Sequence, residues 1–248
     1  MSTNKMLVLI TGANQGLGYY AAQQMSASGK YHILIGSRDL GKAKKAIEAF
    51  TDDKTVDAKP ENVEAIEIEM SSDESIQAAA KTVEQKYGRL DILMPNAGIA
   101  YASGTTREQY QQMYDTNVFG ASVTVEAFLP LLRKSTAAGG KRIAFTSSGL
   151  ASLKMAAEDQ GNYSGAKFGI YRSTKSAMNM VMVHYARLLE GEGFVVSSSD
   201  PGYCATNLNS YSGFKDPRDG AKALVRCATA DKASVHAAMV DEEQKLPW

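Results

Sequence analysis

Short apolar runs alternate with longer segments of helical periodicity along most of the chain. The first run, residues 6–10, is continuously apolar and stops at a turn rich in Gly and Asn, as a strand buried on both faces does. Apolar positions then recur at helical spacing from Leu17 until Gly29. The same patterns predict strands at residues 32–35, 63–69, 90–94, 142–146, 194–198 and 236–240, and helices at residues 43–50, 76–87, 116–133, 171–189 and 221–230.

This alternation of strands and helices requires a parallel sheet. We therefore predict an α/β fold, a Rossmann-type doubly wound parallel sheet of about seven strands in the order 3-2-1-4-5-6-7 with right-handed crossovers. With 248 residues, 44% of them apolar, the chain can bury a full core without disulfides. We find no internal repeat or linker, so residues 1–248 are expected to form a single domain.

Composition narrows the classes of function. The formal net charge is zero and basic residues form no dense run, so the sequence gives no electrostatic case for a nucleic-acid partner. Cys204 and Cys227 are too few for a disulfide framework and too isolated for a metal site. Neither a signal peptide nor a membrane-spanning run of about 20 apolar residues is apparent. We expect a cytoplasmic protein with a small-molecule partner, no metal, and no membrane association.

A glycine-rich turn follows the first predicted strand and opens a helix. Its glycines stand where the chain must turn tightly, approach a pyrophosphate and pack a helix against a strand, while the helix N-terminus favours an anion. The turn predicts a nicotinamide dinucleotide site, and a tight turn without a ligand is the alternative. The expected contacts from this turn are with Gly12, Asn14, Gln15, Gly16, Leu17 and Gly18.

Ser37 and Arg38 follow the second strand, where the adenosine ribose of such a cofactor would lie. An acidic residue here would bond the 2′-hydroxyl, whereas the Arg38 guanidinium can grip a 2′-phosphate. We therefore favour NADP(H) over NAD(H). A merely solvated arginine is the alternative, and the direction of the Asp39 side chain is open.

Two copies of a Tyr-x-x-x-Lys pattern occur, Tyr163 with Lys167 and Tyr171 with Lys175. Residues four apart share one face of a helix, so either pair could set an ammonium beside a phenol and lower the phenol pKa from about 10 toward neutrality. An uninterrupted apolar helical face follows Lys175, whereas glycines break the first copy. We therefore choose Tyr171 and Lys175, and interpret the earlier pair as loop.

Together these motifs resemble the short-chain dehydrogenase/reductase family over essentially the whole chain. The resemblance implies that Tyr171 protonates a carbonyl oxygen as hydride arrives, that Lys175 holds the nicotinamide ribose and lowers the tyrosine pKa, and that Ser148 orients the substrate oxygen. Asn117 matches the asparagine that holds a water in a proton relay. Ser148 is chosen over Ser147 on family register alone.

The resemblance also implies further cofactor contacts and shows departures from the family pattern. The matched positions are Asn96, Ala97 and Gly98 after strand four, and Pro201, Gly202 and Thr206 after strand six. Glu69, followed by Met70, replaces the usual aspartate for the adenine ring. Pro95 replaces the first of two asparagines, and strand four is expected to end there. The long interval from Ser148 to Tyr171 resembles carbonyl reductases with an insertion.

That insertion, residues 149–170, and residues 203–214 are expected to form the rim of a substrate pocket. Their large side chains suggest an apolar or aromatic substrate, but aromatic loop residues more often pack locally, and local packing is the favoured interpretation. These side chains are Met155, Tyr163, Phe168, Tyr203, Tyr211 and Phe214. Structural or surface roles are expected for the histidines His32, His184 and His236.

The leading hypothesis is an NADPH-dependent reductase of a ketone, aldehyde or quinone, or the reverse alcohol dehydrogenase, with Tyr171 as general acid and base. A catalytically silent NADP-binding sensor or scaffold is the alternative from another class, and an epimerase or dehydratase of related fold is a third. The substrate, its stereochemistry and the physiological direction stay open. Family relatives suggest a homodimer or homotetramer, with a monomer not excluded.

Overall fold

One sheet organises the computed structural model, which describes residues 4–158 and 167–248. Its strands lie in the order β3-β2-β1-β4-β5-β6-β7-β8, and all neighbours are parallel except β7 and β8. The strands are β1 (Met6–Thr11), β2 (Tyr31–Ser37), β3 (Val63–Glu67), β4 (Ile92–Met94), β5 (Arg142–Thr146), β6 (Val195–Ser199), β7 (Met239–Val240) and β8 (Lys245–Leu246).

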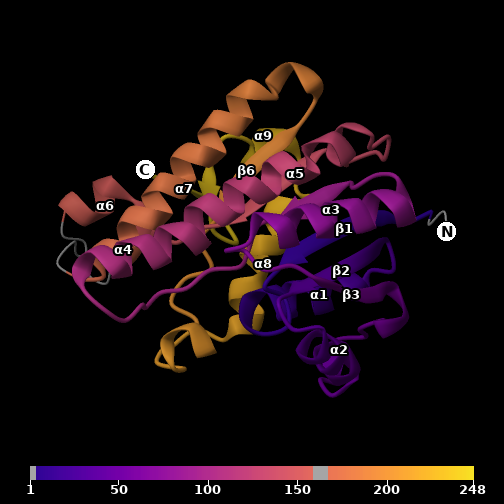
Figure 1. Ribbon diagram of the computed structural model, residues 1–248, viewed down its shortest axis with the longest axis horizontal. Helices are drawn as coiled ribbons and strands as arrows, with labels where there is room; N and C mark the ends of the chain where they lie inside the picture. Colours follow the sequence, from indigo (N-terminus) through magenta and orange to yellow (C-terminus); the bar gives the residue numbers. More distant parts are fainter. Residues whose placement is uncertain (1–3, 159–166) are drawn as a thin grey trace.

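Helices cover both faces of this sheet (Figure 1). One face carries α3 (Asp73–Tyr87), α5 (Ala121–Arg133) and α7 (Gly169–Leu188), and the other carries α1 (Gly16–Ala27), α2 (Leu40–Glu48), α8 (Pro217–Thr229) and α9 (Lys232–Val235). Two further helices are α4 (Thr106–Tyr114) and α6 (Leu153–Ala157), and a π-helical segment, η3 (Asp115–Gly120), joins α4 to α5. Short 3-10 turns are η1 (Ala49–Thr51), η2 (Pro60–Asn62), η4 (Gly149–Ala151), η6 (Glu190–Glu192) and η7 (Asn207–Asn209).

The first strand shows why the sheet needs helices on both sides. Leu7 and Leu9 pack into the core beneath α3, α5 and α7, whereas Val8 and Ile10 pack into the core beneath α1 and α8. All four side chains are fully buried. Alternate residues of a strand point to opposite faces, so a continuously apolar strand has a core on each side.

The predicted order of the first seven strands is confirmed, and β4 ends at Met94, directly before Pro95. An eighth strand was not predicted. Asp241 turns the chain between β7 and β8, because its carboxylate accepts the N–H groups of Glu243 and Gln244 at 2.7 Å. Strands of two residues are too short to show a hydrophobic period, which is why this hairpin escaped the sequence patterns.

The prediction of a helix at residues 116–133 places its start too late in the chain. The helical segment begins at α4, whose Thr105 and Glu108 form a reciprocal capping box. The polar composition of α4 hides it from a search for apolar periodicity, although its capping signal was present in the sequence. The π-helical turn η3 then carries Asn117. Such turns are rare and often occur at functional sites.

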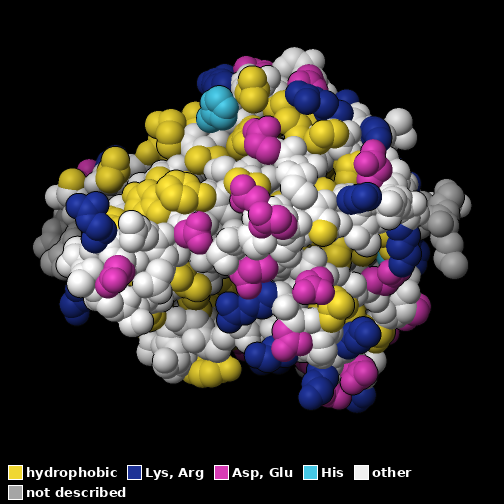
Figure 2. Space-filling model, viewed as in Figure 1, with side chains coloured by type: hydrophobic (Ala, Val, Ile, Leu, Met, Phe, Trp, Pro, Cys, Tyr) yellow, Lys and Arg dark blue, Asp and Glu magenta, His cyan; other side chains and the backbone are white. Residues whose placement is uncertain are grey.

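Among the residues described, no helix combines the length and apolarity needed to cross a membrane. On the face shown in Figure 2, acidic and basic side chains are interspersed with apolar ones. This mixed distribution gives that face no extended area of one charge sign.

The packing of η3 against the loop between β3 and α3 gives a test of the fold. A side-chain Cβ at Gly120 would collide with the carbonyl oxygen of Met70. We expect Gly120→Ala to lower the free energy of unfolding by about 1–3 kcal/mol, the usual cost of overpacking. Gly169→Ala is the matched control, because its Cβ would meet no described atom within 4 Å. Urea denaturation measures both; equal stability of the two variants would contradict this packing.

Candidate active site

Hydrogen bonds between loops fix the carboxyl edge of the sheet, where ligands of doubly wound folds bind. The buried Thr11 hydroxyl accepts the backbone N–H groups of Asn96 and Ala97, each at 3.0 Å. The Asn96 side chain donates to the Thr11 carbonyl at 2.8 Å and accepts from the Thr146 hydroxyl at 3.2 Å. Asn96 therefore ties together the ends of β1, β4 and β5, although Pro95 cannot contribute an N–H.

The glycine turn combines packing glycines with an open helix end. A Cβ at Gly12 would lie 2.8 Å from the Cα of Ala97, and one at Gly18 would lie 2.9 Å from the Cα of Ala13, so neither position tolerates a side chain. Gly16 has a left-handed backbone, with φ of 60°. Gln15 precedes α1 in an extended conformation, and no hydrogen bond from its side chain caps the helix in the part of the chain described. The first N–H groups of α1 are thus left for an anion.

The end of β2 places Arg38 beside this turn. The Arg38 side chain is 78% exposed, and its Nη1 lies 3.9 Å from Oε2 of Glu69, which follows β3. The Asp39 carboxylate faces away toward α2, because it accepts the N–H of Lys42 at 3.0 Å and caps that helix. Buried Ser37 bonds the backbone of Asp39. Of the two expected adenine contacts, Glu69 is half-buried and Met70 is buried.

Asn117 is held by hydrogen bonds to two different segments of the chain. Its amide donates to the Ile99 carbonyl at 2.8 Å and to the Thr174 hydroxyl at 3.0 Å, while its carbonyl accepts the Ile99 N–H at 2.8 Å. The side chain therefore joins the loop after β4 to α7. Gly98 lies in the same corner, where a Cβ would be 3.0 Å from Asn117 Oδ1 and 3.6 Å from Lys175 Nζ.

Tyr171 and Lys175 share the face of α7 that looks onto the end of β5. The Lys175 side chain is buried, and its Nζ donates to the carbonyl oxygen of Thr146 at 2.8 Å. The same Nζ lies 5.7 Å from the centroid of the Tyr171 ring. Tyr171 itself is half-buried. The structure thus brings the second Tyr-x-x-x-Lys pair together at the carboxyl edge of the sheet.

Burial dominates the ionisation of this pair. Burial raises the pKa of Tyr171 above its usual value, and the negative charge of Asp200 raises that pKa further. Burial lowers the pKa of Lys175 from its usual 10.5 to about 8. In this structure the Tyr171 pKa thus shifts away from neutrality, opposite to the direction expected from the ammonium, because loss of hydration dominates it.

The two adjacent serines after β5 differ in environment. Ser147 is 2% exposed, and its hydroxyl has no hydrogen-bond partner among the described residues. Ser148 is half-buried and accepts the N–H of Leu150 at 3.2 Å, so its own proton is free to be donated. Of the earlier tyrosine–lysine pair, Tyr163 lies outside the described residues, and Lys167 is exposed.

The segment after β6 returns to the glycine turn. A Cβ at Gly16 would lie 3.9 Å from the side chain of Thr206, and Gly202 has a left-handed backbone with φ of 76°. Pro201 and Thr206 are buried. The predicted cofactor positions on the first and sixth strands therefore lie next to each other in space.

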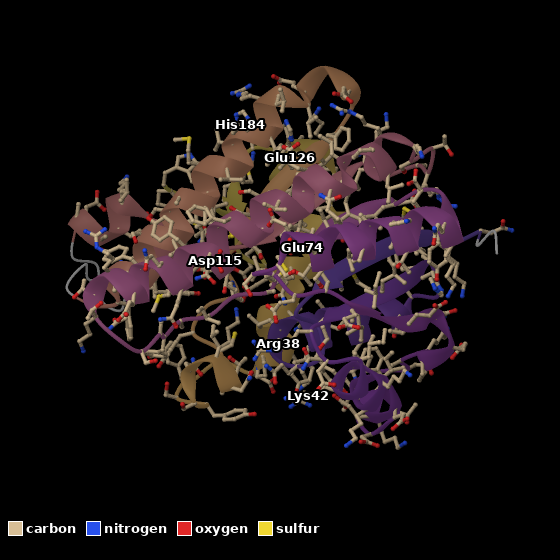
Figure 3. The ribbon with its side chains drawn as sticks, viewed as in Figure 1. Arg38, Lys42, Glu74, Asp115, Glu126 and His184 are labelled. Atoms are coloured by element: carbon tan, nitrogen blue, oxygen red, sulfur yellow. The ribbon has the colours of Figure 1, made fainter. Side chains whose placement is uncertain are left out.

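Sequence reasoning missed the groups that position Lys175 and Asn117. The acceptor of the ammonium is the backbone carbonyl of Thr146, and a backbone group has no sequence signature. Thr174 was also missed, although it directly precedes Lys175 on a predicted helix. The histidines were expected to be structural: His32 bonds Glu64 and Tyr87, and His236 accepts the N–H of Val196, while His184 is exposed on α7 (Figure 3).

The lowered pKa of Lys175 predicts a pH dependence of stability. The unfolded chain holds this proton up to about pH 10.5 and the folded chain only to about pH 8, so the free energy of unfolding should rise with pH across that window. Between pH 7.5 and 10.5, the free energy of unfolding of the wild type should rise by about 3 kcal/mol more than that of Lys175→Met. Denaturant titrations at both pH values measure the gain. Lys81→Met, on the exposed face of α3, is the control, and identical gains for the two variants would contradict a buried ammonium.

Comparison with known proteins agrees with this architecture. Residues 6–215 match the short chain dehydrogenase family. The short-chain dehydrogenase anuI of Penicillium roqueforti is 41% identical over 251 aligned residues, which cover 99% of this chain and 97% of the relative. The short-chain dehydrogenase/reductase eupG of a Phoma species is 36% identical over 226 aligned residues. The alignment covers 82% of this chain and 79% of the relative.

Solved structures share the fold at lower identity. The NADPH-bound carbonyl reductase from chicken fatty liver has a TM-score of 0.81 at 21% identity, covering 99% of this chain and 100% of that one. Salutaridine reductase from Papaver somniferum has a TM-score of 0.79 at 20% identity, covering 96% of this chain and 100% of that one. The family match over residues 6–215 and the 41% identity to a curated relative show that this chain belongs to the short-chain dehydrogenase/reductase family of oxidoreductases.

Proposed function

We propose that this oxidoreductase uses NADPH to reduce a ketone, aldehyde or quinone carbonyl, with Tyr171 as the general acid and, in the reverse direction, the base. The buried Lys175 ammonium beside the Tyr171 ring carries the proposal. A buried ammonium is costly, and a site that keeps one next to a half-buried tyrosine places a general acid beside a group that can replace its proton. Asn117 and a serine, Ser148, complete the proposed set.

The residues of the site divide the work of a carbonyl reduction. When bound, the nicotinamide ring supplies hydride to the carbonyl carbon. The phenol of Tyr171, whose pKa is raised by burial, is protonated at neutral pH and can therefore act as a general acid. The free proton of the Ser148 hydroxyl can hold the substrate oxygen beside that phenol. Because the pKa of Lys175 is about 8, its ammonium can return a proton toward the phenol near neutral pH.

Several cations around the glycine turn support NADPH over NADH. Lys42 and Lys45 line a hollow of about 420 Å³ together with Asn14 and Gln15. Figure 3 labels Arg38 and Lys42, which come from the end of β2 and the first turn of α2. Asp39 is engaged in capping α2, so its charge is partly neutralised by that helix end. A 2′-phosphate would compete with Glu69 for the exposed Arg38 guanidinium.

Exposed aromatic rings support an apolar or aromatic carbonyl substrate. Tyr101 and Phe168 pack edge to face with ring centroids 6.4 Å apart, and Tyr203 and Phe214 do so at 5.7 Å. The aromatic rings of these loops therefore do pack against each other locally. The pairs still leave much of each ring in solvent, with Phe214 76% exposed. Since β5 lies between β4 and β6, the loops that carry Tyr101 and Tyr203 flank the loop of Ser148.

Replacement of the proposed acid tests the function directly. Tyr171→Phe removes only the phenolic hydroxyl. It should lower kcat for carbonyl reduction by about 100-fold to 10,000-fold. The Kd for NADPH, followed by its fluorescence, should stay nearly unchanged. Tyr163→Phe is the matched control and should keep its activity. Loss of turnover in Tyr163→Phe but not in Tyr171→Phe would show that the wrong pair was chosen.

Cofactor choice is tested at the end of β2. Arg38→Ser should raise the KM for NADPH by about tenfold to a hundredfold, because a lost hydrogen bond to a charged group is worth about 1.5–3 kcal/mol. The KM for NADH should change little, since that cofactor lacks the phosphate. Arg187→Ser, in the last turn of α7, controls for the loss of one surface charge. Equal effects of Arg38→Ser on both cofactors would remove the basis for the NADPH preference.

A further inference from the structure

The turn that carries Ser148 is closed by its own hydrogen bonds. The Ser148 carbonyl accepts the N–H of Ala151 at 2.9 Å, and the Ser148 hydroxyl accepts the N–H of Leu150 at 3.2 Å. The Gly149 carbonyl in turn accepts the N–H of Ser152 at 3.1 Å. Ser148 and η4 therefore form one unit, so a contact that holds the end of this turn also holds the serine.

Two carbonyl groups at the end of η4 are bound by side chains of α7. Nη1 of Arg172 donates to the Leu150 carbonyl at 3.3 Å. The Ser176 hydroxyl donates to the carbonyl of buried Ala151 at 2.8 Å. The last carbonyl groups of a helical turn have no partner within that turn, and buried ones need a partner elsewhere. Arg172 and Ser176 are four residues apart and share one face of α7, so this face holds η4 at two successive carbonyl groups.

The same helix holds the chain ahead of Ser148. Lys175 donates to the carbonyl of Thr146, two residues before Ser148, at 2.8 Å. Lys175 directly precedes Ser176, so neighbouring side chains of one helix bind the chain before and after the serine. The distance between Ser148 and Tyr171 on α7 therefore depends on these contacts.

Arg172 also binds the chain that enters α7. Its residue is 7% exposed, and its Nε donates to the Lys167 carbonyl at 2.8 Å. Phe168, the next residue, has a left-handed backbone with φ of 60°, which is unfavourable for a residue with a side chain. A charge-assisted bond to the carbonyl directly before it helps to hold that conformation. One guanidinium thus joins the turn after Ser148 to the segment that leads into Tyr171.

We propose that Arg172 and Ser176 are positioning residues for carbonyl reduction: together they hold η4 so that the Ser148 hydroxyl lies beside the Tyr171 phenol. Their part in catalysis rests on the proposed function, whereas their hold on η4 is a property of the free protein. A misplacement of about 1 Å can cost on the order of 100-fold in rate. Loss of either side chain should therefore act on turnover through Ser148, without either residue touching the substrate.

Hydrogen exchange tests the hold on η4 without turnover. The Ala151 N–H reports on this turn, because it donates to the Ser148 carbonyl. Its exchange, followed by NMR, should be about tenfold faster in Arg172→Met and about threefold faster in Ser176→Ala, since the first variant loses charge-assisted bonds and the second one neutral bond. The N–H of Leu9, a fully buried residue of β1, is the reference for any change in global stability.

Matched controls come from the same helix. Arg187→Met removes an exposed arginine from the last turn of α7. Ser173→Ala removes a hydroxyl that bonds the Ile170 carbonyl of α7 itself. Both variants should leave the exchange of the Ala151 N–H at the wild-type rate.

Kinetics tests whether the hold acts through Ser148. Arg172→Met should lower kcat for carbonyl reduction by about 10-fold to 100-fold and Ser176→Ala by about threefold, while the Kd for NADPH stays nearly unchanged. In a Ser148→Ala background, either substitution should cost about twofold or less, because the hydroxyl that it positions is already gone.

Losses that multiply fully in the double variants would mean that Arg172 and Ser176 are merely structural and would overturn the positioning role. If Arg172→Met does not fold, Ser176→Ala decides the question. Unchanged kcat or unchanged Ala151 exchange in the folded variant would also overturn the proposal. If the wild type reduces no carbonyl but Ala151 exchange still accelerates, the proposed function fails and the hold of α7 on η4 stands.

Discussion

The buried ammonium of Lys175 is the constraint on which the rest of the site depends. A charged group out of water must find a partner, and here the partner is the carbonyl of Thr146, the last residue of β5. That bond ties α7 to the end of β5, on the face of the helix that also carries Tyr171. Burial of the ammonium lowers its pKa to about 8, and burial of Tyr171 itself raises the tyrosine pKa.

A second set of polar contacts makes this placement rigid. Thr11, Asn96 and Thr146 connect the ends of three neighbouring strands, and Asn117 connects the next loop to α7 through Ile99 and Thr174. The π-helical turn and the close approach of Gly98 bring Asn117 to the same corner as Lys175. The cofactor turn and the proposed acid thus belong to one hydrogen-bonded framework and are held in fixed relation to each other.

Much of this architecture could be predicted from sequence patterns. Continuous apolar strands and amphipathic helices determine the order of β1–β7, and the apolar face after Lys175 distinguishes the helical Tyr-x-x-x-Lys pair from the one interrupted by glycine. Polar α4, the π-helical turn and the two-residue strand β8 leave no comparable period. The direction of the Asp39 side chain and the ionisation of Tyr171 depend on hydration and through-space charge, which only the folded chain defines.

We infer that the carboxyl edge of the sheet, between the glycine turn and Tyr171 with Lys175, holds both the dinucleotide and the carbonyl. A crystal structure with NADP⁺ and a ketone inhibitor tests it most directly. We predict the pyrophosphate at the N-terminus of α1, the nicotinamide ribose on the Lys175 ammonium, and the ketone oxygen within hydrogen-bond distance of the Tyr171 hydroxyl. A nicotinamide ring bound away from Tyr171, or a ketone oxygen held by other residues, would contradict the account.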